Sequence, residues 1–263
     1  MVSHQRVEML RRCLAAIDRS EGRPGLQVIV IDNGSTDGSP RLDAEFANVQ
    51  WVRLPKNFGL TKAWNIGWRA ADAPYVLFLH DDTEVEPPAI LRLIEVLDTN
   101  PEAAAVCPLL IGADGSPAPQ LGILPPGGEW RPAAPTGDDL VPVEYPRGAA
   151  LMVRVFNLKA IRKIDERYGQ FGADADLAAQ IRRASRRILL VPAARARHRG
   201  GDRYSALERA DLEQGKAVFL GKYQGSGAGF RARMGAIFGA LLGARFGELK
   251  HELSGQKIDG TQK

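Results

Sequence analysis

Cysteine is scarce in this 263-residue sequence, which contains only Cys13 and Cys107, far apart in the chain. Their spacing matches no zinc or redox motif, so a reducing, cytoplasmic setting is expected. The sequence also lacks an uninterrupted apolar run of the roughly 18 residues that a membrane-spanning helix requires, and no signal peptide opens it. These features predict a protein that is soluble or attached to a membrane surface.

A large excess of charge and two common nucleotide-binding signatures are missing as well. The net charge is +4, which is too modest to indicate a nucleic-acid partner. No G-x-G-x-x-G follows a predicted strand, which disfavours a dehydrogenase of the Rossmann type. No glycine-rich, basic phosphate loop is visible either, which disfavours a nucleotidyltransferase, although a missing N-terminal strand would weaken that argument.

The sequence does contain an ordinary globular composition and a regular alternation of strands and helices. Hydrophobic residues make up 44% of the chain and charged residues 25%, a balance that supports a substantial core. The expected strands are 26–32, 49–54, 75–79, 103–110 and 187–192, and the expected helices are 6–18, 61–71, 87–98, 156–164 and 176–186. This order predicts an α/β fold with a mostly parallel, Rossmann-like sheet flanked by helices, and ligands bind such sheets at the carboxyl ends of the strands.

Two stretches depart from this alternation. Residues 111–146 are rich in proline and glycine and predict an irregular excursion or a short hairpin that crosses the sheet. Residues 205–263 predict a helical tail, whose segment 230–249 is apolar between flanking arginines. That segment is too short to span a bilayer but suits contact with a membrane surface, with the domain or with a second subunit. The final GQKIDGTQK is expected to be frayed.

Three polar residues, His80, Asp81 and Asp82, follow the apolar strand 75–79. Adjacent carboxylates repel each other unless a positive charge lies beside them, so this pair indicates a divalent cation. Mg²⁺ or Mn²⁺ bound by one or two carboxylates and by phosphate oxygens is the chemistry of nucleotide diphosphates. The alternative, in which Asp82 caps the helix that enters at Pro87, fits poorly because four residues intervene.

The expected strand 26–32 also ends in a carboxylate, Asp32, which is followed by Asn33-Gly34-Ser35. A carboxylate in this place can accept hydrogen bonds from a pyrimidine ring or a ribose hydroxyl of a bound nucleotide. Asp, Asn, Gly and Ser are also the ordinary residues of a turn. On this segment alone, the turn is the better interpretation.

Two further candidates lie in FGADADLAAQIRRA and RARHRGG. Asp176 is the expected N-cap of a helix because Leu177 starts the helical pattern. Asp174 precedes it in a glycine-containing loop and remains available as a general base toward an acceptor hydroxyl. His198 follows a strand, where a neutral imidazole can bind a metal, and a solvated loop histidine is the alternative.

In their order and spacing, these segments resemble the family 2 inverting glycosyltransferases of the GT-A fold, and most of all their bacterial rhamnosyltransferase-like branch. The resemblance covers most of residues 2–201 and rests on the stretches VIVIDNGSTDGS, LPKNFGLTKAWNIGWRAA, YVLFLHDDTEV, GAALMVRV, FGADADLAAQIRRA and VPAARARHRGG. It implies an enzyme that moves a sugar, with inversion at the anomeric carbon, from a nucleotide-diphosphate sugar to an acceptor.

The resemblance also implies roles for single residues. Asp174 matches the catalytic aspartate, which deprotonates the acceptor hydroxyl. Asp82 matches the metal-binding aspartate of the D-x-D motif. His198 would complete a site for Mg²⁺ or Mn²⁺, and His80 is a further candidate ligand. The residues implied in donor binding are Ser3, Asp32, Asn33, Asn57, Gly59 and Asp81.

The sequence departs from the family pattern at three places. His80 stands where the D-x-D motif begins with Asp or Asn, so metal binding would depend more on the other ligands. Ala173 replaces the Glu that usually precedes Asp174. The family's first buried strand is expected to be missing, because the chain starts at Met1-Val2-Ser3-His4, and an in-frame upstream extension rich in Val and Ile would supply it. A nucleotide-sugar-binding protein with degraded catalysis is therefore the alternative function.

The resemblance suggests partners and a division of the chain. The donor would be dTDP-rhamnose or a UDP-hexose, and the acceptor a cell-envelope polysaccharide or a glycolipid at the inner face of the cell membrane. Residues 1–204 would form the GT-A domain, with a donor half at about 1–110 and an acceptor half at about 111–204. Residues 205–263 would form a helical appendage that contacts a membrane surface or, in a homodimer, a second subunit.

Overall fold

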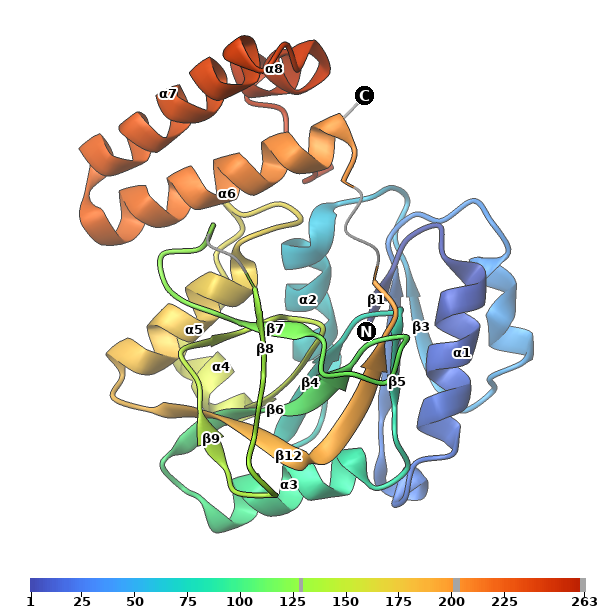
Figure 1. Ribbon diagram of the computed structural model, residues 1–263. Helices are drawn as coiled ribbons and strands as arrows, with labels where there is room; N and C mark the ends of the chain where they lie inside the picture. The colour runs from blue at the N-terminus through green and yellow to red at the C-terminus, as the bar shows by residue number, and fades with distance from the viewer. Residues whose placement is uncertain (128–129, 201–203, 261–263) are drawn as a thin grey trace.

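A computed structural model describes residues 1–127, 130–200 and 204–260 of the chain. Strands in the centre of the molecule are covered by helices, and three helices from the C-terminal part form a further layer, at the top in Figure 1. The predicted α/β class is confirmed, and every predicted strand and helix named above has a counterpart in the structure.

The N-terminal part forms a three-stranded parallel sheet with the order β1 (Val2–Ser3), β2 (Val28–Asp32) and β3 (Val49–Arg53). The prediction that the first strand is missing is therefore wrong, because a strand of two residues, β1, is present. Val2 pairs with β2 on one side and forms an isolated parallel bridge with His80 on the other. Two residues suffice here because their backbone groups find partners toward both neighbouring strands.

The larger sheet has the order β4-β11-β6-β12-β5, with β9 paired to β12. Its strands are β4 (Tyr75–Leu79), β11 (Ala150–Arg154), β6 (Ala103–Ile111), β12 (Arg187–His198), β5 (Thr83–Val85) and β9 (Val141–Pro142). β6 and β12 are parallel, with a register shift between Val191 and Arg195. β11 runs antiparallel to β4 and β6, which the sequence does not reveal, because a strand buried on both faces is apolar whatever its direction.

The excursion 111–146 contains a small antiparallel sheet of order β10-β7-β8. Of the two expected forms, an irregular excursion or a short hairpin, the structure is nearer to the hairpin. Its strands are β7 (Pro119–Gly122), β8 (Arg131–Pro132) and β10 (Tyr145–Pro146). Gln120 is buried and ties β7 to the main sheet, because its amide donates to Pro108 O at 3.0 Å and accepts from Leu110 N–H at 2.6 Å. The excursion is thus anchored to β6.

Helices cover the sheets, and the buried apolar residues of the described chain form two large cores and a small third one of Ile29, Ile31 and Ala63. α1 (Val7–Asp18) and α3 (Ala89–Thr99) contribute to one large core. The other large core includes α2 (Gly59–Ala70), α4 (Val155–Ile161) and α5 (Ala173–Arg183). Their apolar residues recur every three or four positions, which places them on the face toward the sheet. Two short 3₁₀ helices, η1 (Arg23–Gly25) and η2 (Ser39–Ala44), lie in the connections.

The C-terminal layer consists of α6 (Ala206–Gln224), α7 (Ser226–Leu242) and α8 (Phe246–Ser254). α6 begins with a capping box between Ser205 and Glu208. Among the described residues, no helix combines the length and apolar character needed to cross a membrane. The expected fraying is wrong for residues 256–260, where Ile258 is buried, and residues 261–263 lie outside the described ranges.

Candidate active site

Three potential metal ligands meet where β4 ends and β12 ends. His80 and Asp82 follow β4, and His198 is the last residue of β12, paired with Thr83 of β5. One ligand atom of each residue lies within 4.8 Å of the other two, and His198 Nε2 is 3.4 Å from Asp82 Oδ1. The structure therefore brings together the three residues that the sequence predicts as metal ligands.

The surroundings of this cluster fit a divalent cation. His80 Nε2 is buried and makes no hydrogen bond to any part of the chain that the structure describes. Gly200 leaves space beside the cluster, since a Cβ there would lie 2.8 Å from His198 Nε2 and 3.3 Å from Asp82 Oδ2. Two imidazoles and one carboxylate suit Mn²⁺ better than Mg²⁺, which prefers oxygen ligands.

The N-terminal residues partner the adjacent carboxylate, Asp81. Ser3 Oγ donates a hydrogen bond to Asp81 Oδ2 at 2.7 Å, and both side chains are buried. Arg6 Nη1 lies 3.6 Å from Asp81 Oδ1 and 3.1 Å from Asp82 Oδ2. Arg6 is not predicted from the sequence, because it is one of several basic residues around an amphipathic helix and belongs to no motif.

Burial and local charge set the protonation of this cluster. Burial lowers the pKa of His80 to about 4. Burial also raises the pKa of Asp81 to about 6, against the charge of Arg6 and the hydrogen bond from Ser3. Burial acts in the same direction on Asp82, but the hydrogen bond with His198 and the positive charge nearby outweigh it and hold the pKa of Asp82 well below its usual range. Neutral His80 and ionised Asp82 are the forms that bind a metal.

The predicted donor-binding residues also converge at the end of β2. Asn33 Nδ2 donates to Asn57 Oδ1 at 2.8 Å and to Gly59 O at 3.2 Å, and Asn33 Oδ1 accepts from Phe58 N–H at 2.8 Å. Asp32 is buried, and its Oδ1 accepts from Ser35 N–H at 3.0 Å, so the turn that the sequence favours is present. One amide side chain thus fixes the loop that carries Asn57 and Gly59.

Asp174 and Asp176 lie elsewhere than the sequence predicts. α5 begins at Ala173, after Gly172 with φ 99°, so Asp174 is part of the first helical turn and not of a preceding loop. Asp176 is not the N-cap. Its carboxylate is buried and lies 2.8 Å from Lys222 Nζ of α6. Its role is to pair α5 with the C-terminal layer.

Asp174 is held by hydrogen bonds from three sides. Tyr145 Oη donates to Asp174 Oδ1 at 3.0 Å, Gly148 N–H donates to Oδ2 at 3.2 Å, and Ala175 N–H donates to Oδ1 at 2.8 Å. Burial nevertheless raises the pKa of Asp174 above its ordinary value, and these hydrogen bonds oppose the shift. A carboxylate with a raised pKa is a stronger base than a free one, which suits proton abstraction from a hydroxyl.

Two neighbouring residues connect Asp174 with the metal-ligand cluster. Gly148 N–H donates to Asp174, and Ala149 O accepts from His80 N–H at 2.9 Å. Both residues lie just before β11. The contacts of Tyr145 and Gly148 with Asp174 are not predicted from the sequence, because no motif marks Tyr145 in the irregular excursion 111–146 and Gly148 contributes only its main-chain N–H group.

Comparison with known proteins agrees with this geometry. The model of the family described as "Glycosyl transferase family 2" matches residues 1–157, more than half of the chain. The chain belongs to glycosyl transferase family 2. Among the residues discussed above, the match includes the metal-ligand positions His80 and Asp82, whereas Asp174 and His198 lie beyond it.

Two curated relatives of this family 2 glycosyltransferase are named as a rhamnosyltransferase and as a synthase of an N-acetylglucosamine polymer. It is 29% identical over 220 residues to the N-acetylglucosaminyl-diphospho-decaprenol L-rhamnosyltransferase of Mycobacterium tuberculosis (strain ATCC 25618 / H37Rv), covering 72% of this chain and 71% of the relative. It is 30% identical over 118 residues to the poly-beta-1,6-N-acetyl-D-glucosamine synthase of Staphylococcus epidermidis, covering 39% of this chain and 29% of that protein.

Solved structures confirm the fold of the glycosyltransferase. The crystal structure of GalNAc-T7 with UDP, GalNAc and Mn²⁺ matches with a TM-score of 0.69 and 15% identity over 83% of this chain. S. aureus TarS matches with a TM-score of 0.62 and 14% identity over 84% of this chain. The chain spans 46% and 38% of these two proteins, respectively. At such identities the likeness establishes the GT-A fold alone, as the sequence predicts.

Proposed function

We propose that this glycosyltransferase transfers a sugar with inversion from a nucleotide-diphosphate sugar to an acceptor hydroxyl. The observation that carries the proposal is a pair of unlike carboxylates at one end of the sheet. Asp82 lies between two imidazoles, and Asp174 lies among neutral hydrogen-bond donors with a raised pKa. The first arrangement suits a cation and the second suits a base.

In the proposed reaction, Asp174 takes the proton from the acceptor hydroxyl while its oxygen attacks the anomeric carbon. The bond between that carbon and the diphosphate oxygen breaks, and the diphosphate leaves with the electron pair. Tyr145 and Gly148 keep the carboxylate oriented through their hydrogen bonds. A single displacement from the face opposite the leaving group inverts the anomeric configuration.

We assign the metal site to His80, Asp82 and His198, with Mn²⁺ as the better candidate because of the two imidazoles. A divalent cation there supplies Lewis-acid neutralisation of the charge on the departing diphosphate. Asp81 and Ser3, next to this site, are proposed donor contacts. Around the end of β2, the proposed donor contacts are Asp32, Asn33, Asn57 and Gly59.

The names of the relatives guide the proposed substrates. The mycobacterial relative is an L-rhamnosyltransferase with a lipid-linked acceptor by name, which favours dTDP-rhamnose as donor and a glycolipid as acceptor. A UDP-hexose and an envelope polysaccharide are the second choice, because UDP is present in the GalNAc-T7 structure by its title and the staphylococcal relative is named a polysaccharide synthase. We propose that residues 1–110 bind the donor and residues 111–204 the acceptor.

We further propose that the C-terminal layer rests on an anionic membrane surface, where a lipid-linked acceptor is accessible. Large apolar side chains are exposed along α7 and at the start of α8, with exposed fractions of 49% to 87%, namely Phe230, Phe238, Leu241, Leu242 and Phe246. α7 contains no acidic residue and carries Arg231 and Arg233. Both cysteines are free and buried, so we place the reaction in a reducing compartment, at the inner face of the cell membrane.

Sedimentation with vesicles tests this surface contact. The protein is expected to sediment with vesicles that contain phosphatidylglycerol and less with neutral phosphatidylcholine vesicles, because both apolar contact and positive charge contribute. The double variant Phe238→Ser and Leu242→Ser should lose this binding. A different result would assign the surface to a second subunit. In that case the parent protein would not bind vesicles and would be a dimer in light scattering, and the same double variant would be a monomer.

The transferase proposal is tested first by calorimetry with UDP, dTDP and GDP, in Mn²⁺ and in EDTA. We expect one nucleotide to bind in a metal-dependent way and Asp82→Ala to abolish this binding. Transfer or donor hydrolysis is then measured with the matching nucleotide sugar, and Asp174→Asn should remove it. Nucleotide binding without any turnover would favour the alternative, a nucleotide-sugar-binding protein in which Ala173 replaces a family Glu.

A further inference from the structure

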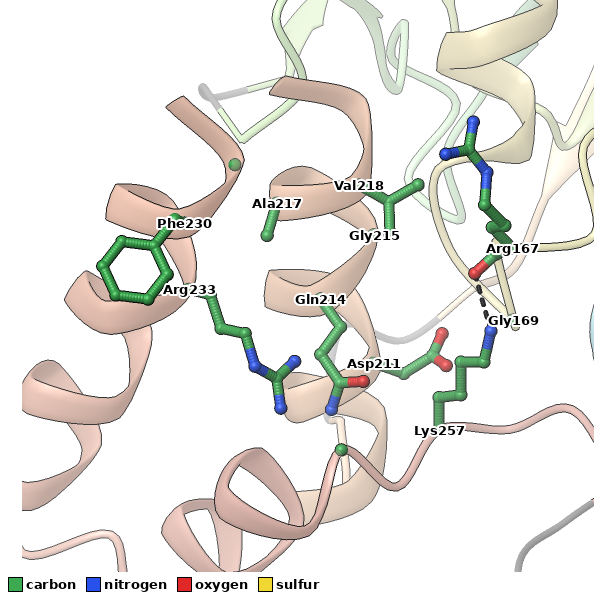
Figure 2. Close-up of a pocket in the computed structure, with 12 residues that line it drawn as sticks. Arg167, Gly169, Asp211, Gln214, Gly215, Ala217, Val218, Phe230, Arg233 and Lys257 are labelled. Carbon is green, nitrogen blue, oxygen red and sulfur yellow. Dashed lines mark hydrogen bonds between the residues drawn. The ribbon is translucent and has the colours of Figure 1, made fainter. Parts of the chain in front are cut away.

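Residues 256–260, called the C-terminal strap below, follow α8 and return to the catalytic domain. Gln214 Nε2 of α6 donates to Gln256 O at 3.0 Å, and Lys62 Nζ of α2 donates to Asp259 O at 2.9 Å. Lys257 Nζ donates to Arg167 O at 2.7 Å, as Figure 2 shows. The strap is therefore tied to α6, to the start of α2 and to the segment before α5.

Asp211 of α6 joins the strap to the loop that leads into α5. Its Oδ1 accepts from Ile258 N–H at 2.9 Å, and its Oδ2 accepts from Gln170 N–H at 2.8 Å and from Phe171 N–H at 3.0 Å. The side chain is buried and points toward Gly169 and the strap in Figure 2. One carboxylate thus holds three main-chain N–H groups from two segments far apart in the sequence.

Close main-chain contacts carry this connection on to the proposed donor pocket. A Cβ added at Gly59, where φ is +79°, would collide with Ile258 O, and one added at Gly169 would collide with Asp211 and lie 2.8 Å from Ile258 O. Thr61 of α2 donates both N–H, at 3.2 Å, and Oγ1, at 3.0 Å, to Gly169 O. The backbones at Gly59, Gly169 and Ile258 therefore touch directly, without side chains between them.

A cavity borders the C-terminal strap on one side. A cavity of about 370 Å³ lies among α6, α7, the strap and the loop at 167–169, and Figure 2 shows the side chains of Phe230, Arg233 and Gln214 around it.

Burial raises the pKa of Asp211 to about 6, and the three N–H donors oppose the shift, so the carboxylate is ionised at neutral pH. Hydrogen bonds to an ionised acceptor are the strong ones.

We propose that Asp211 is a positioning residue for the transfer reaction. Through Gln170 and Phe171 it places the loop that leads into α5 and hence Asp174, and through the strap it places Gly59 of the donor loop. This inference rests on the proposed function for its kinetic consequences. Its structural part, the coupling of the two loops, stands on the contacts alone.

The test compares Asp211→Asn with the parent enzyme. Asparagine keeps one acceptor oxygen and replaces the other with an NH₂ group that cannot accept, so at least one of the three hydrogen bonds is lost. We expect kcat to fall by about 10- to 100-fold, the loss typical of a small misplacement of reacting groups, and the donor KM to rise as well. Glu213→Gln makes the same chemical change on the same helix, and should leave kcat and KM unchanged.

Hydrogen exchange provides a readout that does not depend on turnover. In Asp211→Asn the amides of Gln170, Phe171 and Ile258 should exchange faster, and so should those of Gly59 and Thr61, with no change in β6 and β12. Gln214→Met, which removes only the hydrogen bond to Gln256, should give a weaker form of the same pattern and guards against a misfolded first variant.

Two results would overturn the inference. Faster exchange spread over the whole protein in both variants would mean a merely structural role, and unchanged exchange at Gly59 and Thr61 would mean that the strap does not couple the loops. If the parent enzyme transfers no sugar with any donor, the proposed function fails, while the exchange pattern still decides whether Asp211 couples the two loops.

Discussion

Asp82 and Asp174, two carboxylates at the same end of the sheet, differ in the direction in which their pKa values are shifted. Asp82, between His80 and His198, has a pKa well below the usual range, whereas Asp174, held by Tyr145 and main-chain N–H groups, has a raised pKa. Burial pushes both pKa values upward. The difference therefore comes from the partners, since charged or ionisable groups lie beside Asp82, whereas the described groups that donate hydrogen bonds to Asp174 are neutral.

This contrast distinguishes the proposed metal ligand, Asp82, from the proposed general base, Asp174, although both are aspartates. A carboxylate that remains ionised is suited to a permanent cation, and one that accepts a proton readily is suited to a base. Replacing Asp82 should therefore impair metal binding, and replacing Asp174 should impair proton transfer.

The largest effect is expected for Asp174→Asn. The amide cannot take a proton, so kcat should fall by about 10²- to 10⁴-fold, the range of general-base catalysis. The amide keeps the side-chain shape, so Mn²⁺-dependent nucleotide binding should remain. Initial rates and calorimetry on the same sample measure both, and a variant with parental kcat would remove Asp174 from the reaction.

The complementary change, Asp82→Asn, should act on metal affinity first. Loss of the ligand's charge should weaken Mn²⁺ binding by about 10- to 100-fold or more, since even partners behind a ligand contribute that much. Electron paramagnetic resonance of free Mn²⁺ measures the affinity directly. Excess Mn²⁺ should restore part of the activity, which it should not do for Asp174→Asn; equal behaviour of the two variants would refute the division of roles.

A third carboxylate, Asp176, has a structural role, because it forms an ion pair with Lys222 of α6. Lys222→Met leaves this buried carboxylate without its cation and should lower the free energy of unfolding by about 3 kcal/mol, as measured by urea denaturation. Lys222→Arg is the matched control and should lose less. Adding Asp176→Asn to Lys222→Met should recover part of the stability, and no recovery would mean that the ion pair is not the cause.

The smallest effect is expected for Tyr145→Phe. The lost hydroxyl donates to Asp174 and opposes the rise of its pKa, so the pKa of Asp174 should rise further and the acid limb of the kcat/KM profile should move to higher pH. Because the pKa of Asp174 is already raised on folding, its contribution to stability decreases as the pH rises from the unfolded-state pKa through the folded-state pKa. An acid limb that stays in place would exclude Asp174 as its source.

Much of the fold follows from the sequence because its signals are local. The buried apolar runs at 28–32 and 75–79 and the helical spacing at 7–18 determine strands and helices through their immediate neighbours. The direction of β11 depends on its neighbouring strands, and the sequence of β11 itself, ALMVR at 150–154, does not show which strands these are. The two-residue β1 is invisible for the same reason, since its stability comes from pairing with β2 and from the bridge to His80.

In the candidate site, too, some residues can be predicted from the sequence and others only from the folded structure. His80 and Asp82 stand out because they follow an apolar strand, and His198 because it comes shortly after the apolar run of 187–192; their convergence follows from the order of the strands. Asp174 stands out as well, but its place in α5 is mispredicted because the N-cap of the helix is Gly172, with a positive φ, and not Asp176. Arg6 and Tyr145 become visible only when the chain is folded, because long-range packing alone brings them to the carboxylates.

The register shift in β12 makes the site sensitive to the length of the chain. After the shift, between Val191 and Arg195, buried and exposed residues alternate strictly, so that Ala196 and His198 face inward and Arg195 and Arg197 face outward. Because alternation has a period of two, deleting the codon of Ala196, inside the paired part of the strand, would turn the imidazole out to the solvent and an arginine in, without altering any residue of the cluster. Substitutions in this strand can be absorbed locally, whereas an insertion or deletion of one residue changes which side chain meets Asp82.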